Sequence, residues 1–336
     1  MTDNKNPHPE GTSRRRALGG LAGVAGAAAL ATGTGAETAH ATPRPSRVRT
    51  YVLVHGTHSA GAFWTAIGRE LALRGHRVVA VDQPLHGTEK FIPKAYQEQD
   101  LRALETEPSP VAALTLDDFE RRVTGAVRRA ARLGGPVILV GHSMGGASVS
   151  RVADAVPELL DHICYMAAFC PSRTMPSMDA CTASPEGQHA ISPVGHMIGD
   201  PDKLGVLRLN WRTADRSALA TFKEMICADY SDVEFLRVLE GMQTDESTTA
   251  YGNRAVGRAA TWGRVPRTYL RFGKDRTVAT QLQDRMIAEA DALTPHNRFT
   301  VHDFPTAGHL GPADPSPVVN VLHGLGARTG RNPRTL

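Results

Sequence analysis

Short apolar runs alternate with stretches of helical periodicity along most of the chain. The runs at 49–55, 78–81, 137–140, 162–168, 268–272 and 298–304 have the length and composition of buried strands. Helices are predicted between and after them, at 63–74, 116–133, 147–156, 280–292 and 317–325. This alternation predicts an α/β fold, a mostly parallel sheet of about six strands with helices on both faces.

The alternation stops between residues 171 and 265. This segment has helical stretches at 203–211, 218–228 and 233–240 and no convincing strand. A segment inserted after one strand of an open α/β sheet lies above the carboxyl ends of the strands, where ligands bind. We therefore expect a helical cap, or lid, at about 171–265 within a single domain at 42–336.

Residues 1–41 are expected to direct export rather than to belong to the domain. Consecutive arginines at 14–16 precede a Gly- and Ala-rich apolar stretch at 19–32, and the small-residue sequence Ala-His-Ala follows at 39–41. These parts, in this order, are typical of a twin-arginine signal peptide with its cleavage site. The apolar stretch is too short and too rich in Gly and Ala to favour a stable membrane anchor. A secreted protein is predicted.

The charge and motif content of the chain argue against several function classes. With 38 Lys and Arg against 34 Asp and Glu the net charge is +4, and the paired arginines lack interleaved aromatics, so no nucleic-acid partner is expected. There is no metal-ligand cluster and no phosphate-binding loop of the Walker type, so neither a metal nor another cofactor is expected. The sequence does not decide between a monomer and a dimer.

Four cysteines lie in the predicted domain: Cys164, Cys170, Cys181 and Cys227. They form no Cys-x-x-Cys pair, so zinc or thioredoxin-like chemistry has no support. Export permits disulfides, and four cysteines allow three complete pairings, between which the sequence does not choose.

A serine stands between glycines at the end of the strand predicted for 137–140. The sequence Gly141-His-Ser143-Met-Gly145 follows that strand directly and leads into a predicted helix. In this context a Gly-x-Ser-x-Gly pattern predicts a sharp, strained turn that exposes the serine hydroxyl as a nucleophile. The same turn aims the backbone N–H of Met144, near a helix N-terminus, at the place where negative charge would develop.

A serine nucleophile needs a base to take its proton and a carboxylate to orient the base. In this architecture the order along the chain is serine, acid, histidine, with the last two in loops after later strands. Asp275 follows the strand predicted for 268–272, and His309 follows the strand predicted for 298–304. We therefore predict Ser143 as nucleophile, Asp275 as acid and His309 as base.

The second donor to an oxyanion is expected in the loop after the first strand, which begins His55-Gly-Thr-His58. Gly56 would let the backbone approach the reacting carbonyl closely, and the N–H of Thr57 is then the natural donor. His55 is expected to order this loop rather than to move protons.

The other histidines are weaker candidates for the base. His302 and Asp303 lie inside a predicted strand, and His142 is expected to point away from the site into the sheet. His86 could border the pocket, although an ordinary loop histidine is the favoured interpretation. His189 and His196, in the cap segment, could face either substrate or solvent.

These residues together resemble the α/β-hydrolases, and more narrowly the branch that contains plant methyl esterases and hydroxynitrile lyases, with bacterial esterase relatives. The resemblance covers essentially all of 42–336, except that the loop at 85–115 is longer than the branch usually shows and the middle of the cap matches poorly. It implies the same nucleophile, acid, base and backbone donors. The matching segments are 52–56 with Gly61 and Trp64, 141–146, 227–233, 266–270 with 275–277, and 307–309.

The expected function is hydrolysis of small to medium carboxylic esters through an acyl-enzyme. A carbon–carbon lyase, a dehydratase or a cofactor-free haloperoxidase could use the same triad, and a ligand-binding relic of the fold is a further alternative. The resemblance implies that lyases of this branch carry a threonine after the histidine of the first loop and a lysine after the catalytic histidine. Here those positions are Gly56 and Leu310, both possible pocket residues, so an esterase is predicted over a lyase.

Overall fold

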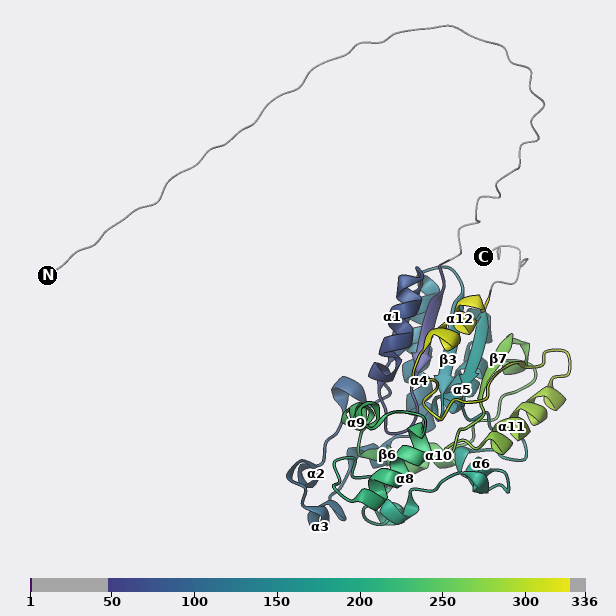
Figure 1. Cartoon of the computed structure of the whole chain (residues 1–336). Coiled ribbons are helices and arrows are strands. Elements are labelled where there is room, and N and C mark those ends of the chain that lie inside the picture. The colour runs from purple at the N-terminus through teal and green to yellow at the C-terminus, as the bar shows by residue number, and fades with distance from the viewer. Residues whose placement is uncertain (2–47, 327–336) are drawn as a thin grey trace, which may run out of the picture. The chain divides into compact units, whose positions relative to one another are not determined.

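The computed structural model describes Met1 and residues 48–326 (Figure 1). The predicted export signal at 1–41 lies outside the described residues, apart from Met1. Every helix and strand of the described part lies within 48–326.

Six parallel strands form the central sheet, in the order β2-β1-β3-β4-β7-β8. The strands are β1 (Thr50–Val54), β2 (Arg77–Val81), β3 (Val137–His142), β4 (His162–Met166), β7 (Arg267–Phe272) and β8 (Thr300–Phe304). Each apolar run of the sequence matches one of them to within two residues at either end, so the predicted six-stranded parallel sheet is confirmed. Val54 of β1 is in register with Gly141 of β3. The loops that follow these two strands therefore leave the sheet side by side.

Helices cover both faces of the sheet because its central strands are apolar on both sides. In β1, Tyr51 and Leu53 face one layer and Val52 and Val54 face the other, and all four are fully buried. The first layer contains α1 (Thr65–Leu73) and α12 (Ser316–Gly324), and the second contains α4 (Leu116–Arg132), α5 (Gly145–Ala155) and α11 (Thr280–Leu293). The alternation of side chains along each strand thus supplies an apolar core to both layers.

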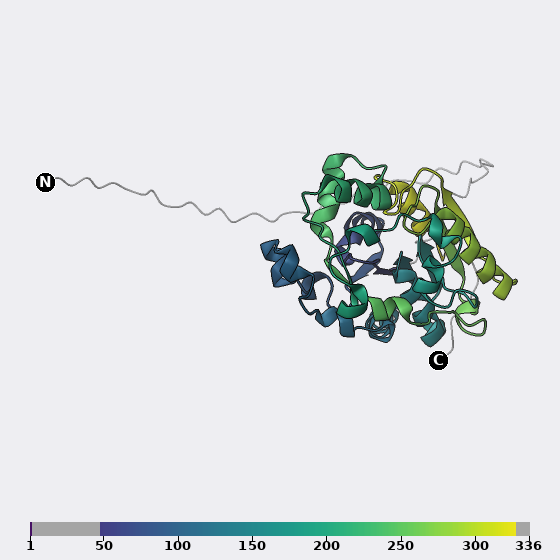
Figure 2. The same cartoon turned by 90° about the horizontal axis from the view of Figure 1, so that it is seen from below.

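The segment 171–265 contains five α-helices and a small antiparallel sheet. Its elements are α6 (Met178–Thr182), α7 (Pro201–Leu204), β5 (Val206–Arg208), α8 (Arg216–Cys227), α9 (Asp232–Gly241), β6 (Asp245–Ser247) and α10 (Thr248–Gly252). In Figure 1 the labelled elements α8, α10 and β6 lie at the carboxyl ends of the strands, and Figure 2 views the domain from that side. An apolar cluster within the segment, including Trp211, Phe222 and Phe235, packs these elements together.

The prediction of a helix at 203–211 and of no strand in this segment was wrong. Gly205, with a φ of +69°, ends α7, and the chain then enters β5, which pairs with β6. Arg208 and Asp245 are opposite each other in this pairing and form a fully buried ion pair, with Nη2 and Oδ2 2.7 Å apart. Each strand has only three residues, which is too short for an alternating pattern to show in the sequence.

The segment between β2 and α4, expected to be one long polar loop, contains two short helices, α2 (Lys94–Glu98) and α3 (Leu101–Leu104). Arg208 Nη1 donates hydrogen bonds to the carbonyl oxygens of Leu104 (2.6 Å) and Glu107 (2.8 Å). The β5–β6 hairpin and this segment are therefore tied together by one buried guanidinium.

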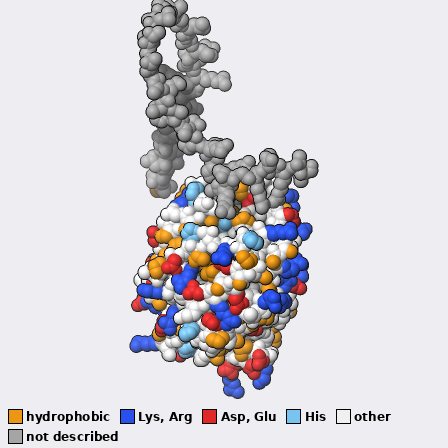
Figure 3. All heavy atoms as spheres, turned by 90° about the vertical axis from the view of Figure 1, so that its right-hand side faces the viewer, with side chains coloured by type: hydrophobic (Ala, Val, Ile, Leu, Met, Phe, Trp, Pro, Cys, Tyr) orange, Lys and Arg blue, Asp and Glu red, His pale blue; other side chains and the backbone are white. Residues whose placement is uncertain are grey.

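The surface carries charges of both signs. Figure 3 shows Lys and Arg interspersed with Asp and Glu on the face that lies to the right in Figure 1. Arg285 of α11, for example, pairs with Glu186 (2.5 Å) and Glu289 (2.9 Å). Among the described residues, no helix combines the length and the apolar character that crossing a membrane requires.

Candidate active site

Ser143 lies on a strained turn between β3 and α5, as the sequence predicted. Its φ is +52°, a left-handed backbone conformation that a residue with a side chain rarely adopts. Its carbonyl oxygen holds the turn by accepting the N–H groups of Gly146 and Phe169, both at 3.0 Å. A Cβ on Gly145 would lie 2.6 Å from the carbonyl oxygen of Val54, so only glycine allows α5 to start this close to β1.

His309 and Asp275 are in direct contact, although they are 34 residues apart in the sequence. His309 Nδ1 lies 2.8 Å from Asp275 Oδ2, and because a carboxylate only accepts, Nδ1 carries the proton. The other oxygen, Oδ1, accepts the N–H groups of Thr277 (2.8 Å) and Val278 (2.9 Å). The carboxylate is thus held by the loop after β7 and fixes the tautomer of the imidazole.

His142 does not point away into the sheet, contrary to our expectation. Its ring stacks on Phe63 at 4.5 Å between centroids and lies 4.7 Å from the ring of His309. Its Nε2 donates to the carbonyl oxygen of His309 (2.9 Å), and burial together with His309 holds the pKa of His142 well below its usual value. A neutral His142 therefore connects the turn of Ser143 to the loop of His309.

Within residues 48–326 the Ser143 hydroxyl makes no hydrogen bond to another protein group. Catalytic hydrogen bonds of this kind often form only when substrate is bound.

Gly56, in the loop after β1, lies against the nucleophile. A Cβ at this position would be 2.7 Å from Ser143 Cβ and 3.2 Å from its hydroxyl oxygen, so no other residue fits in this geometry. His55 Nδ1 donates to the carbonyl oxygen of Gly56 (2.8 Å), while His55 Nε2 accepts the N–H of Gln83 (3.1 Å). Burial, together with the nearby His86, lowers the pKa of His55 to about 4. As predicted, His55 orders this loop.

Two backbone N–H groups beside Ser143 are free to bind an oxyanion. Met144 precedes the first residue of α5, and Thr57 follows Gly56. In the part of the chain that the structure describes, neither N–H donates to a protein acceptor. Unpaired donors at a helix N-terminus and in a facing loop are the arrangement that stabilises a developing negative charge.

Sequence reasoning missed a buried polar network behind the oxyanion loop. His86 is not an ordinary loop histidine: its side chain and that of Glu246, in β6, are fully buried, with Nε2 and Oε2 3.1 Å apart. The same Oε2 accepts the backbone N–H of His58 (3.2 Å). The residues come from three distant segments, and no local pattern in the sequence relates them.

Leu310, which follows His309, contacts the cap. Its N–H donates to the carbonyl oxygen of Ile226 in α8 (3.1 Å), and its half-buried side chain packs against the apolar cluster of the cap. Position 310, where the resemblance implies a lysine in the lyases, therefore has an apolar side chain here and apolar neighbours.

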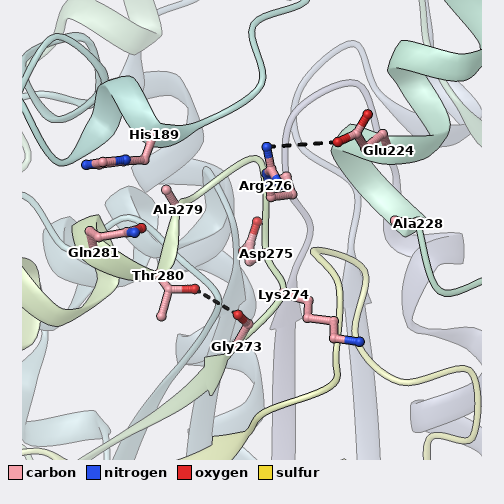
Figure 4. A pocket seen from close by; sticks show the side chains of 10 residues that line it. All are labelled: His189, Glu224, Ala228, Gly273, Lys274, Asp275, Arg276, Ala279, Thr280 and Gln281. Atoms are coloured by element: carbon pink, nitrogen blue, oxygen red, sulfur yellow. Dashed lines mark hydrogen bonds and ion pairs between the residues drawn. The ribbon is translucent and has the colours of Figure 1, made fainter.

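A pocket of about 490 Å³ borders the loop of Asp275 (Figure 4). Ser143 and His309 are not among its lining residues, whereas His189 and Glu224 of the cap are. Arg276, at its centre, faces Glu224 across 3.9 Å. The pocket lies between residues of the cap and the loop that carries Asp275. Among the described residues, no group of three or more His, Cys, Asp or Glu side chains could hold a metal ion.

The fold and this geometry define an α/β hydrolase. Residues 51–321 match the family described as the alpha/beta hydrolase family, and the chain belongs to it.

Its relatives include ester hydrolases. The pyrethroid hydrolase of Sphingobium wenxiniae (strain DSM 21828 / CGMCC 1.7748 / JZ-1) is 26% identical over 246 residues, which are 71% of this chain and 75% of that protein. Methylesterase 9 of Arabidopsis thaliana is 22% identical over 244 residues, 70% of this chain and 84% of that protein. The crystal structure of a pyrethroid hydrolase from Sphingobium faniae JZ-2 superposes with a TM-score of 0.59 at 22% identity, over 83% of this chain and 97% of that one. The predicted branch of the family is thereby confirmed.

Proposed function

We propose that the protein is a serine carboxylesterase that cleaves small to medium esters through an acyl-enzyme. The observation that carries the proposal is the bond between His309 Nδ1 and Asp275 Oδ2, next to a serine held on a left-handed turn. The serine, the acid and the base follow one another along the chain in the order that this fold uses. Relatives that hydrolyse esters support the same reaction.

In the proposed reaction, Ser143 Oγ attacks the carbonyl carbon of the ester and its proton passes to His309 Nε2. The N–H groups of Thr57 and Met144 bind the oxyanion of the tetrahedral intermediate, and Asp275 stabilises the imidazolium. The intermediate collapses as His309 gives the proton to the leaving alkoxide. A water molecule, deprotonated by His309, then attacks the acyl-enzyme, and the carboxylic acid leaves as Ser143 regains its proton.

Crowding around Gly56 favours hydrolysis over the lyase reaction. A threonine at 56 would place its Cβ 2.7 Å from Ser143 Cβ, so the loop has no room for the hydroxyl that the resemblance assigns to the lyases. Leu310 supplies no positive charge for a departing cyanide. The alternatives of a lyase, a dehydratase or a haloperoxidase are therefore less well supported than an esterase.

The test is a pre-steady-state assay with a p-nitrophenyl ester. An acyl-enzyme releases one equivalent of p-nitrophenol per active site in a burst, before the slower steady state. The same assay with methyl esters and pyrethroid esters, the substrate classes that the relatives' names indicate, would show which acid and alcohol parts of the ester the enzyme accepts. A steady state without a burst, unaffected by Ser143→Ala, would overturn the proposal.

The proposal includes export. The support is the sequence at 1–41, with arginines at 14–16 and small residues at 39–41. Expression of the full chain in a bacterium with a twin-arginine pathway should give an extracytoplasmic protein whose N-terminus is Thr42. Replacement of the arginines at 14–16 by lysine should keep the protein in the cytoplasm. An unprocessed, cytoplasmic wild-type protein would contradict the export signal and leave the esterase proposal intact.

A further inference from the structure

The loop that carries the Thr57 N–H is held at two points by one short segment of the cap. The Thr57 hydroxyl makes a short hydrogen bond with the hydroxyl of Tyr251, in α10. The N–H of His58 donates to Glu246 Oε2 over 3.2 Å. The N–H of Thr57, which has no protein acceptor within residues 48–326, directly precedes both contacts along the backbone. Both contacts therefore lie within one residue of the proposed oxyanion donor, on its carboxyl side.

The backbone of the loop needs such support. His58 has a φ of +54°, which is unusual for a residue with a side chain and persists only where the surroundings hold it. The N–H of Gln243 donates to the carbonyl oxygen of His58 (2.7 Å), and His58 Nδ1 donates to the carbonyl oxygen of Gln243 (3.0 Å). Together with Glu246, the segment 243–246 therefore binds both backbone groups and the ring of His58.

Glu246 is itself fixed by a second histidine. His86 Nδ1 lies 2.8 Å from the carbonyl oxygen of Pro84, and His86 Nε2 lies 3.1 Å from Glu246 Oε2. Because a carbonyl and a carboxylate only accept, an ionised Glu246 requires a proton on both ring nitrogens, and His86 is then an imidazolium. Burial opposes this charge, but the carboxylate outweighs it and raises the pKa of His86. A carboxylate in such a pair keeps its position in the interior.

Tyr251 contacts the turn of the nucleophile as well as the oxyanion loop. Its ring packs against Phe169 with the centroids 6.4 Å apart, and the N–H of Phe169 donates to the carbonyl oxygen of Ser143. Tyr251 thus connects the oxyanion loop to the turn that carries the nucleophile. Burial raises the pKa of the Tyr251 phenol, so its hydroxyl stays protonated.

We infer that Glu246 and Tyr251 are positioning residues that orient the Thr57 N–H toward the oxyanion. The inference rests on the proposed ester hydrolysis, because only a reaction with an oxyanion needs this donor. An N–H that is misaligned with the developing charge loses stabilisation in the transition state while ground-state binding changes little. Neither side chain acts on the substrate: each acts through the loop that it holds.

The test compares Tyr251→Phe, Glu246→Gln and Glu246→Ala with the wild type. Tyr251→Phe removes one hydroxyl, and we expect kcat to fall about tenfold, with KM within about twofold. Glu246→Ala should lower kcat by about a hundredfold, and Glu246→Gln, which keeps an oxygen for the His58 N–H, should recover part of that loss. Asp245→Asn is the matched control: the residue is a buried neighbour in the same strand, but its carboxylate pairs with Arg208 and not with the loop.

Inhibitor binding separates positioning from a merely structural role. A trifluoromethyl ketone forms an oxyanion on Ser143 and mimics the transition state, so its Ki should rise in proportion to the fall in kcat/KM across the variants. The Ki of a carboxylate product, which forms no oxyanion, should stay within about twofold. Circular dichroism and thermal unfolding report whether each variant folds, and Tyr251→Phe, which deletes a single hydroxyl, keeps the test possible should Glu246→Ala not fold.

The outcomes are distinguishable. Wild-type kcat and ketone affinity in folded Tyr251→Phe and Glu246→Gln, or equal losses in Asp245→Asn, would overturn the inference and leave the esterase proposal standing. A wild-type enzyme without a Ser143-dependent burst would instead overturn the esterase proposal.

Discussion

His309 Nδ1 donates a hydrogen bond of 2.8 Å to a carboxylate oxygen of Asp275, while the other oxygen accepts two backbone N–H groups from the loop after β7. Gln283 Nε2 adds a longer contact of 3.3 Å to the same oxygen as the imidazole. The carboxylate is 2% exposed, so its charge is available to His309 and is not screened by water. This relationship fixes which nitrogen of His309 faces Ser143.

Asp275→Asn should lower kcat by about four orders of magnitude. The amide can donate to Nδ1, which favours the tautomer with the proton on Nε2 and so removes the base from the nucleophile. Asp303→Asn is a suitable control, because Asp303 pairs with Arg271 in β7 (2.7 Å) and is remote from His309 in the hydrogen-bond network. The measurement is kcat for an aryl ester. An Asp275→Asn enzyme with wild-type kcat would mean that the acid lies elsewhere.

Ser143→Ala should abolish the burst and the turnover and leave folding intact. The hydroxyl makes no protein hydrogen bond within 48–326, so its removal should change the free energy of unfolding by less than about 1 kcal/mol. Denaturant unfolding and burst kinetics on the same preparation check both parts. Wild-type turnover in Ser143→Ala would contradict the esterase proposal.

Gly56→Ala should lower kcat by about a hundredfold, because the added Cβ would lie 2.7 Å from Ser143 Cβ and must displace the nucleophile or the loop. Gly241→Ala in α9 is the matched control, since a Cβ there meets no atom within 4 Å. Steady-state kinetics on one ester should show wild-type activity in the control only. Equal activity in both variants would show that the loop can move to accommodate the added Cβ without a loss of kcat.

The wild-type protein should release no measurable cyanide from mandelonitrile. A lyase needs a positive charge to stabilise the departing cyanide in a dry pocket, and Leu310 packs against the apolar side chains of the cap. The assay is cyanide detection alongside an ester assay on the same enzyme. Efficient cyanide release without an acyl burst would reverse the choice between esterase and lyase and leave the triad assignment in place.

The sequence predicted the parts of the molecule whose signals are local. The turn at Ser143 shows in five consecutive residues, and the order of serine, acid and histidine places Asp275 and His309 after their strands. The contacts of Glu246 could not be predicted in this way, since its partners His58 and His86 are 188 and 160 residues away. β6, which carries Glu246, has three residues and no recognisable period. Such contacts depend on tertiary packing and cannot be recognised from a local sequence pattern.

The cysteines illustrate the same limit, because the sequence left three disulfide pairings open and the structure has all four thiols free and buried. Burial raises the pKa of Cys170, Cys181 and Cys227 to about 12, so thiolate is scarce near neutral pH. We expect a thiol reagent such as DTNB to react slowly with the native protein and to titrate four thiols after unfolding. Two or four fewer thiols in the unfolded, non-reduced protein would indicate disulfides.

The buried pair of His86 and Glu246 should make the stability of the protein depend on pH. Burial opposes charge on both groups, but their mutual attraction outweighs burial. The pKa of His86 is therefore raised above 6.5, and the pKa of Glu246 is lowered below 4.5. A histidine with a raised pKa stabilises the folded state fully below its unfolded pKa and loses this contribution as the pH rises through the folded value. A carboxyl with a lowered pKa contributes fully above its unfolded pKa and loses this contribution as the pH falls through the folded value.

The pair should therefore contribute most between about pH 4.5 and 6.5. Asp82 also raises the pKa of His86. Burial lowers the pKa values of His55 and His58, so both side chains are neutral in the folded state near neutral pH. Both therefore destabilise the folded state as the pH falls. Glu246 raises the pKa values of His55 and His58 as well, so the comparison with Glu246→Gln at each pH reports the carboxylate together with all three histidines. The difference in Tm between the wild type and this variant should be largest in that window and should shrink at higher pH as His86 loses its proton. A difference that is constant from pH 4 to 9 would show that the pair is not ionised.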